Sequence, residues 1–266
     1  MEISLRNVVR RGFGHTLNCE DEALSTVFDD RLAIMVTFDG CSTGIKSHFA
    51  SGLFGKIFKK ILIQDESYYK ESVDDRSLEE ICRYTIRRAF LELRHMVHYL
   101  ELIPKEVLAT IVMAVVDLEK KKAFVAMIGD GSIYIDGEMH TVDCPGNAPM
   151  YLAAFLDREN FKDVWEEALV FSGTYTFNET IAVMTDGIDS FFNKKDNRYI
   201  NDEEKEMVIN QLLKSNKFLK NEIGLARICN ILQTYNHFEP KDDLSISRLT
   251  FISPIDDSIQ QTGTED

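Results

Sequence analysis

The sequence predicts an α+β fold in which antiparallel sheets carry helices on their outer faces. Segments with strand composition and segments with helical periodicity occur in separate runs, whereas a doubly wound parallel sheet requires them to alternate. No proline-, glycine- or serine-rich linker and no internal repeat divides the 266 residues. We therefore expect one domain over 1–252, followed by a disordered acidic tail at 253–266.

The expected elements follow from the spacing of apolar residues. Strands rich in β-branched and aromatic residues are predicted at 3–9, 23–28, 32–38, 107–116, 123–128, 132–135, 139–142, 169–171, 180–185 and 244–251. Helices are predicted at 46–63, 77–97, 202–213 and 221–235. Ser77 and Glu80 form a capping box at the start of the second helix, and Asp136-Gly137 is read as a plain hairpin turn. The proline-containing segment at about 144–168 is predicted to be an irregular flap.

Composition excludes several classes of protein. No apolar run approaches the ~20 residues that cross a bilayer, and the start lacks the features of a secretory signal. The five cysteines are scattered and never form a Cys-x-x-Cys pair, which argues against disulfides and structural zinc. With a net charge of -14 and no dense basic patch, neither nucleic acid nor an anionic membrane is an expected partner. We expect a soluble, cytoplasmic protein.

Acidic residues are placed where apolar strands begin or end. The positions concerned are Glu20-Asp21, Asp39-Gly40, Gly129-Asp130-Gly131, Asp186-Gly187 and Asp242-Asp243. A carboxylate at the end of a buried strand is held rigidly, and a following glycine permits close approach of backbone or ligand. A single Asp-Gly is most often only a turn. The ordered combination, each member at a strand boundary, is far more specific.

Carboxylates brought together in this way require a cation or a proton between them. Hard divalent ions with oxygen ligands fit this pattern, and the lack of paired histidine or cysteine ligands argues against zinc. Two such ions about 3.5–4 Å apart activate a water and orient a phosphate for in-line attack. The sequence thus predicts hydrolysis of a phosphomonoester without a protein nucleophile.

In their order along the chain, these residues resemble the metal-dependent protein phosphatases of the protein phosphatase 2C family, in particular a bacterial branch. The resemblance extends over nearly the whole chain. It rests on Gly14-His15 with Cys19-Glu20-Asp21, Asp39-Gly40, Ala109-Thr110, Gly129-Asp130-Gly131-Ser132, Thr185-Asp186-Gly187 and Lys241-Asp242-Asp243-Leu-Ser. It implies a four-layer αββα sandwich, in which two antiparallel sheets are flanked by helix pairs and metals lie at one edge.

The resemblance also implies roles for individual residues. Asp39 would bridge two Mn²⁺ or Mg²⁺ ions, and Asp186 and Asp242 would complete one site. The Gly40 carbonyl would complete the other, with Glu20 or Asp21 acting directly or through water. Asp130 matches a position that family members use for a third, weaker ion. The substrate would be a phosphorylated protein, and a cognate Ser/Thr kinase would add the phosphate.

Two positions depart from the family pattern. Thr16 occupies the place of an arginine that binds the substrate phosphate, and Cys41 the place of a histidine proposed to protonate the leaving group. His15, Lys46 and Arg11 are candidates to substitute. We favour His15 as the catalytic partner of Asp39, because it lies beside the acidic pair and titrates near neutral pH.

Two other functions remain open at this stage. A cysteine-dependent phosphatase would use Cys41, but that chemistry needs a His-Cys, five residues and then an arginine, and Ser47 stands at the arginine position. A pseudophosphatase would use the same fold as a regulatory scaffold, which the two departures keep open. Against it, a carboxylate is present at every expected metal position, and a carboxylate cluster without a cation is destabilising.

Overall fold

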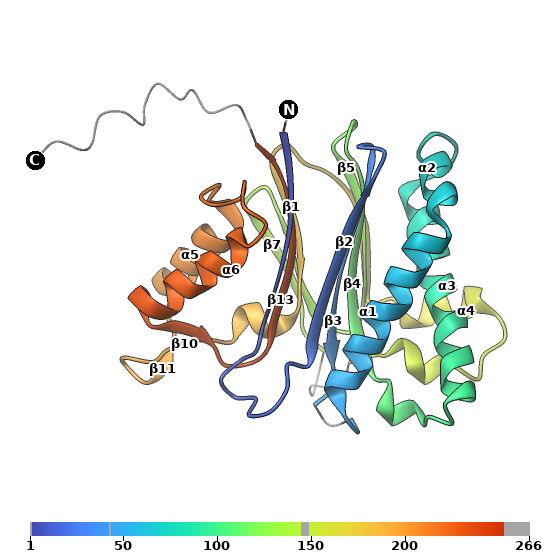
Figure 1. The fold of residues 1–266 in the computed structure, drawn as a ribbon, viewed down its shortest axis with the longest axis horizontal. Helices are drawn as coiled ribbons and strands as arrows, with labels where there is room; N and C mark the ends of the chain where they lie inside the picture. The colour runs from blue at the N-terminus through green and yellow to red at the C-terminus, as the bar shows by residue number, and fades with distance from the viewer. Residues whose placement is uncertain (1, 43, 145–148, 253–266) are drawn as a thin grey trace, which may run out of the picture.

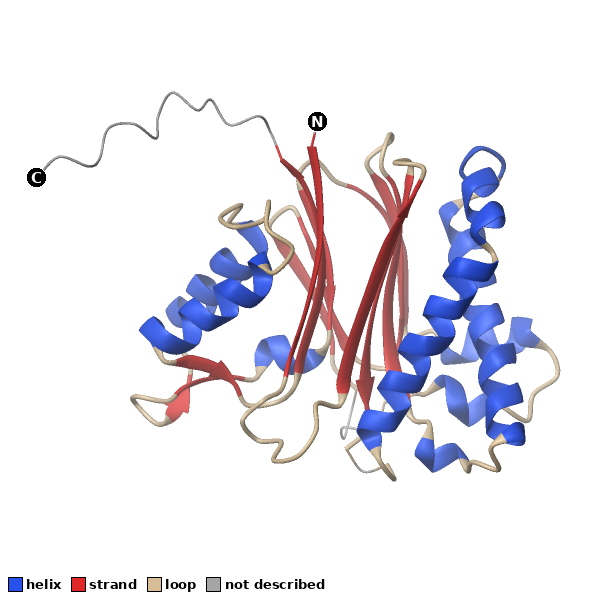
Figure 2. Cartoon of the chain, in the orientation of Figure 1, coloured by secondary structure: helices blue, strands red, loops and turns tan. Residues whose placement is uncertain are grey.

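The protein folds into a sandwich of two five-stranded antiparallel sheets, each covered on its outer face by helices (Figure 1, Figure 2). The computed structural model describes residues 2–42, 44–144 and 149–252. The predicted α+β class and its four-layer αββα arrangement are confirmed. The predicted tail at 253–266 lies outside the described residues, as do residues 145–148 of the predicted flap.

The first sheet has the strand order β2-β3-β4-β5-β8, and its neighbouring strands are antiparallel. Its strands are β2 Asp21–Phe28, β3 Leu32–Gly40, β4 Ala109–Asp117, β5 Lys122–Ile128 and β8 Phe171–Thr176. The central strands β3 and β4 are buried almost throughout, because helices cover one face of the sheet and the second sheet covers the other. Burial on both faces explains why these segments appear in the sequence as continuous apolar runs.

The second sheet has the order β1-β13-β9-β6-β7. Its strands are β1 Glu2–Arg10, β13 Leu244–Ile252, β9 Thr180–Met184, β6 Gly131–Ile135 and β7 Glu138–Val142. The first and last strands of the chain pair along their whole length. Asp136-Gly137 joins β6 to β7 as predicted, and both residues have positive φ (47° and 111°), which is typical of a type I′ hairpin turn.

Helices cover the outer face of each sheet. The first sheet carries α1 Ser47–Gln64, α2 Glu66–Asp75, α3 Leu78–Tyr99 and α4 Phe161–Ala168. The second carries α5 Asp202–Ile209 and α6 Gly224–Ile231, which continue into the π-helical turns η5 Asn210–Lys214 and η6 Leu232–Asn236. Single 3₁₀ turns occur at η1 Pro104–Glu106, η3 Leu152–Phe155 and η4 Asp186–Asp189. The predicted capping box of α3 is present, with Ser77 and Glu80 bonding each other's backbone N–H.

The structure corrects several predicted elements. Helix α2 was not expected, because its sequence is polar with little apolar periodicity. The segment predicted to be irregular contains η3 and the helix α4. The strand predicted at 169–171 is instead the half-exposed edge strand β8. A small third sheet, made of β10 Phe191–Asn193, β11 Arg198–Tyr199 and β12 Phe238–Pro240, was also missed, because strands this short carry no pattern.

The apolar core lies in three layers, one under each set of helices and one between the sheets. In the first layer, Phe38 of β3 packs against Phe54 and Phe58 of α1 with ring centroids 5.8 and 5.0 Å apart. This contact fixes α1 over the end of β3, where the acidic residues begin. Within the described ranges, no helix is long and apolar enough to cross a membrane.

Candidate active site

The predicted acidic residues lie at a common edge of the two sheets, where β1 ends and β2 begins (the lower edge in Figure 1). Asp21 opens β2 and pairs directly with Asp39 near the end of β3. From the second sheet, Asp186 follows β9 and Asp242 lies just before β13. Because neighbouring strands run in opposite directions, the end of one strand and the start of the next meet at the same edge.

A cavity of about 90 Å³ opens between these strand ends. All the predicted site residues except Asp21 line it, and Cys41, Ser42, Pro149 and Tyr151 complete its wall. The predicted residues that line it are His15, Glu20, Asp39, Gly40, Asp130, Asp186 and Asp242. No lysine or arginine is among the described residues of this wall.

Asp21 lies beneath the cavity and is held from both sheets. Its side chain is buried and accepts a hydrogen bond from the Thr185 hydroxyl at 2.6 Å. The same hydroxyl oxygen accepts a hydrogen bond from the Ser245 N–H at 2.9 Å. Asp21 also lies opposite Asp39 in the β2–β3 ladder, and repulsion between the two carboxyls disfavours the ionisation of both.

Burial and mutual repulsion raise the pKa values of this cluster. Burial raises the pKa of Asp39 well above its usual range, and the nearby carboxylates of Asp21, Asp186 and Asp242 raise it further. Burial, followed by repulsion from Asp242 and Asp130, raises the pKa of Asp186 to about 7. Burial also raises the pKa of Asp130, which lies near Asp143. Without a cation, these carboxyls therefore stay protonated in the folded chain up to a higher pH than they would in water.

His15 is the basic side chain at the mouth of the cavity. Its Nε2 lies 2.8 Å from Oδ1 of Asp242, and its Nδ1 lies 3.6 Å from Glu20 and 3.7 Å from Asp243. Burial opposes a charge on this ring, but the surrounding carboxylates outweigh that effect and raise the pKa of His15 above its ordinary value. His15 is thus poised to carry a proton beside the acidic cluster.

Asp243 anchors the loop that carries His15. Its side chain is almost completely buried, and it accepts hydrogen bonds from the backbone N–H groups of Gly12 and Glu20. Gly12 packs so closely that an added Cβ would lie 2.2 Å from the Asp242 backbone. Gly40 is equally restricted, since a Cβ there would lie 2.1 Å from the Ser47 carbonyl oxygen. Glycine at these two positions allows the loop, α1 and the strand ends to come together.

The donor set fits a hard divalent cation by its chemistry. It consists of carboxylates and a backbone carbonyl, and the part of the wall that the structure describes contains no lysine or arginine to neutralise them. As the side chains are placed, however, no three of the described His, Cys, Asp or Glu residues form a ready-made metal site. His15 holds Asp242, and Thr185 holds Asp21. Metal binding would therefore require these side chains to reorient.

The sequence did not reveal all residues that shape the site. Thr185 was noted only as part of a motif, and Asp243 only as a neighbour of Asp242. Tyr151 was missed because it lies in the segment predicted to be irregular. Its side chain lines the cavity and forms a hydrogen bond with Cys41, and burial raises the pKa of its hydroxyl. No local pattern marks such residues, since only the fold brings them to the cavity.

Of the three candidates to replace the missing arginine and histidine, only His15 lines the cavity. The Arg11 guanidinium donates instead to the carbonyl oxygens of Thr16 and Leu17, at 3.3 and 3.4 Å, and so supports the loop. Lys46 lies at the N-terminus of α1 with φ of 66° and is exposed. Cys41 stands in the cavity wall, where it contacts Tyr151.

The model of the protein phosphatase 2C family matches residues 13–219, and the chain belongs to this family. The predicted resemblance is therefore confirmed, and with it the class of enzyme, a metal-dependent serine/threonine phosphatase among the hydrolases. No curated protein sequence matches the chain significantly.

Solved structures share the fold at low sequence identity. Serine/threonine phosphatase Stp1 from Staphylococcus aureus is 15% identical with a TM-score of 0.56, and the alignment covers 96% of each chain. The phosphatase domain of SpoIIE from Bacillus subtilis, solved with a fragment of its regulatory domain, is 16% identical with a TM-score of 0.55. That alignment covers 94% of this chain and 64% of the SpoIIE chain. RsbX in complex with magnesium is 15% identical with a TM-score of 0.50, covering 93% of this chain and 94% of RsbX.

Proposed function

We propose that the protein dephosphorylates phosphoserine or phosphothreonine in protein substrates, with two divalent ions bound at the shared edge of the sheets. One observation carries the proposal. Asp39 in β3, Asp186 after β9 and Asp242 before β13 line a single cavity, and no lysine or arginine is among the described residues of its wall. Such an arrangement costs stability in the absence of a cation, so its presence favours a metal-dependent role.

The proposed ligands are those expected from the sequence. Asp39 would contact both ions, Asp186 and Asp242 would hold one, and the Gly40 carbonyl with Glu20 or Asp21 would hold the other. Asp130 would serve a third, weaker site. When bound, Mn²⁺ or Mg²⁺ ions would lower the pKa of a water and offset the negative charge of the phosphate.

The chain's own residues position the reacting groups. The pairing of β2 with β3 fixes the position of Asp39. The close packing of Gly40 against Ser47 orients the carbonyl group of Gly40. Nε2 of His15 lies 2.8 Å from Oδ1 of Asp242, and a proton carried on this ring would be available to the leaving serine or threonine oxygen. Tyr151 lines the same cavity, and its hydroxyl would donate a hydrogen bond to the phosphate in place of the missing arginine once it turns from Cys41.

The substrate would be a phosphoprotein. A Ser/Thr protein kinase would therefore produce the substrate of this enzyme. Stp1 is a serine/threonine phosphatase, and magnesium is bound to RsbX, so the fold is compatible with both parts of the proposal. Manganese and magnesium are both to be tested.

The decisive experiment is hydrolysis of a phosphothreonine peptide with Mn²⁺, with EDTA, and with Mn²⁺ on Asp39→Asn. We expect turnover only in the first. Asp30→Asn is the matched control, because Asp30 is exposed in the turn at the other end of β3. Near-normal turnover by Asp39→Asn would disprove the metal assignment, and equal loss in Asp30→Asn would indicate a nonspecific defect.

A second candidate is a pseudophosphatase that acts as a scaffold. The observations that favour it are Thr16 and Cys41 at the two positions that depart from the family, and the engagement of Asp242 by His15. Titration calorimetry with Mn²⁺ separates the two functions when combined with the activity assay. A folded protein without turnover under any divalent ion, whether it binds metal or not, would favour the scaffold.

A further inference from the structure

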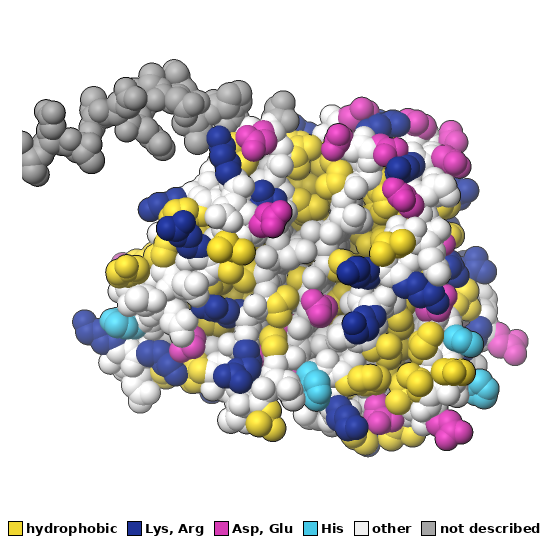
Figure 3. Space-filling model, viewed as in Figure 1, with side chains coloured by type: hydrophobic (Ala, Val, Ile, Leu, Met, Phe, Trp, Pro, Cys, Tyr) yellow, Lys and Arg dark blue, Asp and Glu magenta, His cyan; other side chains and the backbone are white. Residues whose placement is uncertain are grey.

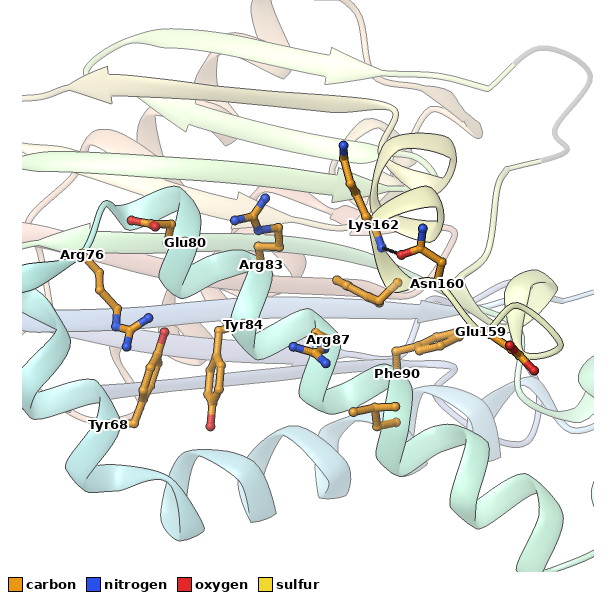
Figure 4. A pocket seen from close by; sticks show the side chains of 12 residues that line it. Tyr68, Arg76, Glu80, Arg83, Tyr84, Arg87, Phe90, Glu159, Asn160 and Lys162 are labelled. Carbon is orange, nitrogen blue, oxygen red and sulfur yellow. Dashed lines mark hydrogen bonds between the residues drawn. The ribbon is translucent and has the colours of Figure 1, made fainter.

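A basic groove lies on the outer helical layer, away from the active site. It runs between α2, α3 and the start of α4, and encloses a cavity of about 470 Å³ (Figure 4). Four cationic side chains line it: Arg76, Arg83, Arg87 and Lys162. It shares no residue with the cavity of the active site.

Within the described ranges the arginines of this groove are only weakly paired: Arg76 and Arg83 help to lower the pKa of Glu80, after the hydrogen bonds that Ser77 gives it. In the described part of the chain, Arg76, Arg83 and Arg87 form neither a hydrogen bond nor an ion pair, although Arg76 lies over the ring of Tyr68. The adjacent Arg88 is different, since its Nε lies 2.8 Å from Asp65. Arg83 and Arg87 are four residues apart on α3, so they share one face of the helix and repel each other.

The acidic residues in the groove neutralise these cations only in part. Glu80 is occupied by the capping box, where it accepts hydrogen bonds from the N–H and the hydroxyl of Ser77. Glu159 faces the groove from the segment before α4, and Lys162 lies 3.8 Å from Glu166. A cluster of cations is unusual in a chain of net charge -14. On the face shown in Figure 3, basic side chains are scattered among acidic ones.

The shape of the groove favours an extended chain. Its lining on α3 runs from Glu80 to Leu91, which is ~16 Å of helix. This length corresponds to roughly five residues of extended peptide. Figure 4 shows the cationic side chains spread along the groove, with Arg76 at one end and Arg83, Arg87 and Lys162 farther along it.

The aromatic rings of the groove argue against a nucleobase. Tyr68 stacks on Tyr84 with centroids 3.8 Å apart, and the Arg76 guanidinium lies 5.0 Å from the centre of the Tyr68 ring. Because the Tyr68 ring is stacked between these two groups, it offers no free face for a base. Its hydroxyl oxygen is buried and, among the described residues, has no hydrogen-bond partner.

We propose that this groove docks an acidic peptide segment of a protein partner, with Arg83 and Arg87 as the principal contacts for its carboxylates. Arginine is suited to this contact because its planar guanidinium can donate two hydrogen bonds to one carboxylate. The inference goes beyond the proposed function, since docking at the groove requires neither metal nor turnover. Segments of this kind would be attracted here and repelled by the rest of the acidic surface.

The test is fluorescence anisotropy of a labelled peptide of about ten residues, rich in Glu and Asp around a Tyr, with the full chain. A peptide with Gln and Asn at the acidic positions is the ligand control. The variant Arg83→Ala/Arg87→Ala is compared with Lys56→Ala/Lys59→Ala, which removes the same charge from exposed positions of α1 outside the groove. Circular dichroism and thermal unfolding establish that each variant is folded.

We expect the acidic peptide to bind, the Gln/Asn peptide not to bind, and the arginine variant to lose at least about tenfold in affinity. The lysine variant should stay within about twofold, and raising the salt from about 0.05 to 0.3 M should weaken binding. Absence of binding, or equal weakening in both variants, would overturn the proposal. The proposal would also be overturned if a single-stranded oligonucleotide bound more tightly than the acidic peptide and the arginine variant lost this binding. The binding assay needs no metal, so its result is independent of whether the protein shows phosphatase activity.

Discussion

Asp21, the first residue of β2, pairs directly with Asp39 of β3, so the main-chain ladder fixes a buried carboxyl beside a partly buried one that lines the cavity. A slip of β2 by one residue in this register would turn the Asp21 side chain to the opposite face of the sheet, away from Asp39. The two carboxyls therefore meet because of the strand pairing itself and not because of flexible loops. Their raised pKa values are the electrostatic consequence.

Stability of the metal-free protein should fall as the pH rises from about 4 to 7. In the folded chain the pKa of Asp186 is raised to about 7, whereas an unfolded Asp titrates near 3.9. Between these values the folded state keeps a proton that the unfolded state has released, so the free energy of unfolding decreases with pH. Asp186 contributes at most about 4 kcal/mol to this loss. Thermal unfolding in EDTA at several pH values measures the effect.

Asp186→Asn tests whether this residue is responsible. The metal-free variant should unfold several degrees higher than the parent at pH 8 and should gain less from added Mn²⁺. Asp30→Asn, in the exposed turn, should behave as the parent under both conditions. An unchanged pH slope in Asp186→Asn would contradict the electrostatic account of the cluster.

Thr185→Val should destabilise the protein by about 1–3 kcal/mol, because it leaves buried polar groups without a partner. The change removes the donor to Asp21 and the acceptor of the Ser245 N–H. Urea unfolding measures the loss, and Mn²⁺ titration should show weaker binding. Thr176→Val, at the exposed end of β8, is the control and should change stability by less than about 0.5 kcal/mol. Equal effects would mean that the buried hydroxyl has no special role.

His15→Gln should slow hydrolysis according to the leaving group. With a phosphothreonine peptide, whose alkoxide needs a proton, kcat should fall by about 10²–10⁴. With p-nitrophenyl phosphate, whose leaving group needs no proton, the fall should be small. His98→Gln, at the end of α3 far along the chain from the site, serves as the control. Equal losses on both substrates would rule out His15 as the proton donor.

Gly40→Ala should lose both stability and activity. The added methyl would lie 2.1 Å from the Ser47 carbonyl oxygen and 3.0 Å from that of Glu20, so backbone must move. We expect a cost of about 1–3 kcal/mol. Gly52→Ala is the matched control on α1, where a Cβ meets nothing within 4 Å. It should stabilise the protein by about 0.5–1 kcal/mol. Tolerance of alanine at Gly40 would show that the close approach is not required.

Tyr151→Phe should lower kcat/KM for the phosphopeptide by about tenfold, since one donor to the phosphate is lost. The melting temperature should stay within a few degrees, because the ring is kept. Tyr175→Phe on β8 is a control outside the cavity. Unchanged kinetics would remove Tyr151 from the phosphate site.

The fold class and the placement of the acidic residues could be predicted because both depend on local patterns. The central strands are continuous apolar runs, and Asp39 and Asp186 stand directly at strand ends. The antiparallel arrangement then brings those ends together. The cavity confirms that the predicted residues converge, whereas their roles in metal binding and catalysis stay predictions.

The rest depends on tertiary contacts that leave no periodic trace. Helix α2 is polar along most of its length and is held by a few buried residues such as Tyr69 and Val73. Tyr151 lies far along the chain from Asp39 and Asp242, and only the tertiary fold brings the three into one cavity wall. Neither a polar helix nor a single tyrosine in an irregular segment is distinguishable from a surface loop by sequence spacing.

The division of the acidic cluster between the sheets has a mechanical consequence. Asp21 and Asp39 belong to one sheet, while Asp186 and Asp242 adjoin strands of the other. A displacement of one sheet along the other by a single residue, ~3.3 Å, would pull the two pairs of carboxyls out of alignment. Metal binding in the cavity would therefore depend on the alignment of the two sheets. A bound ion would link the two sheets, and amide hydrogen exchange would then slow in both sheets together.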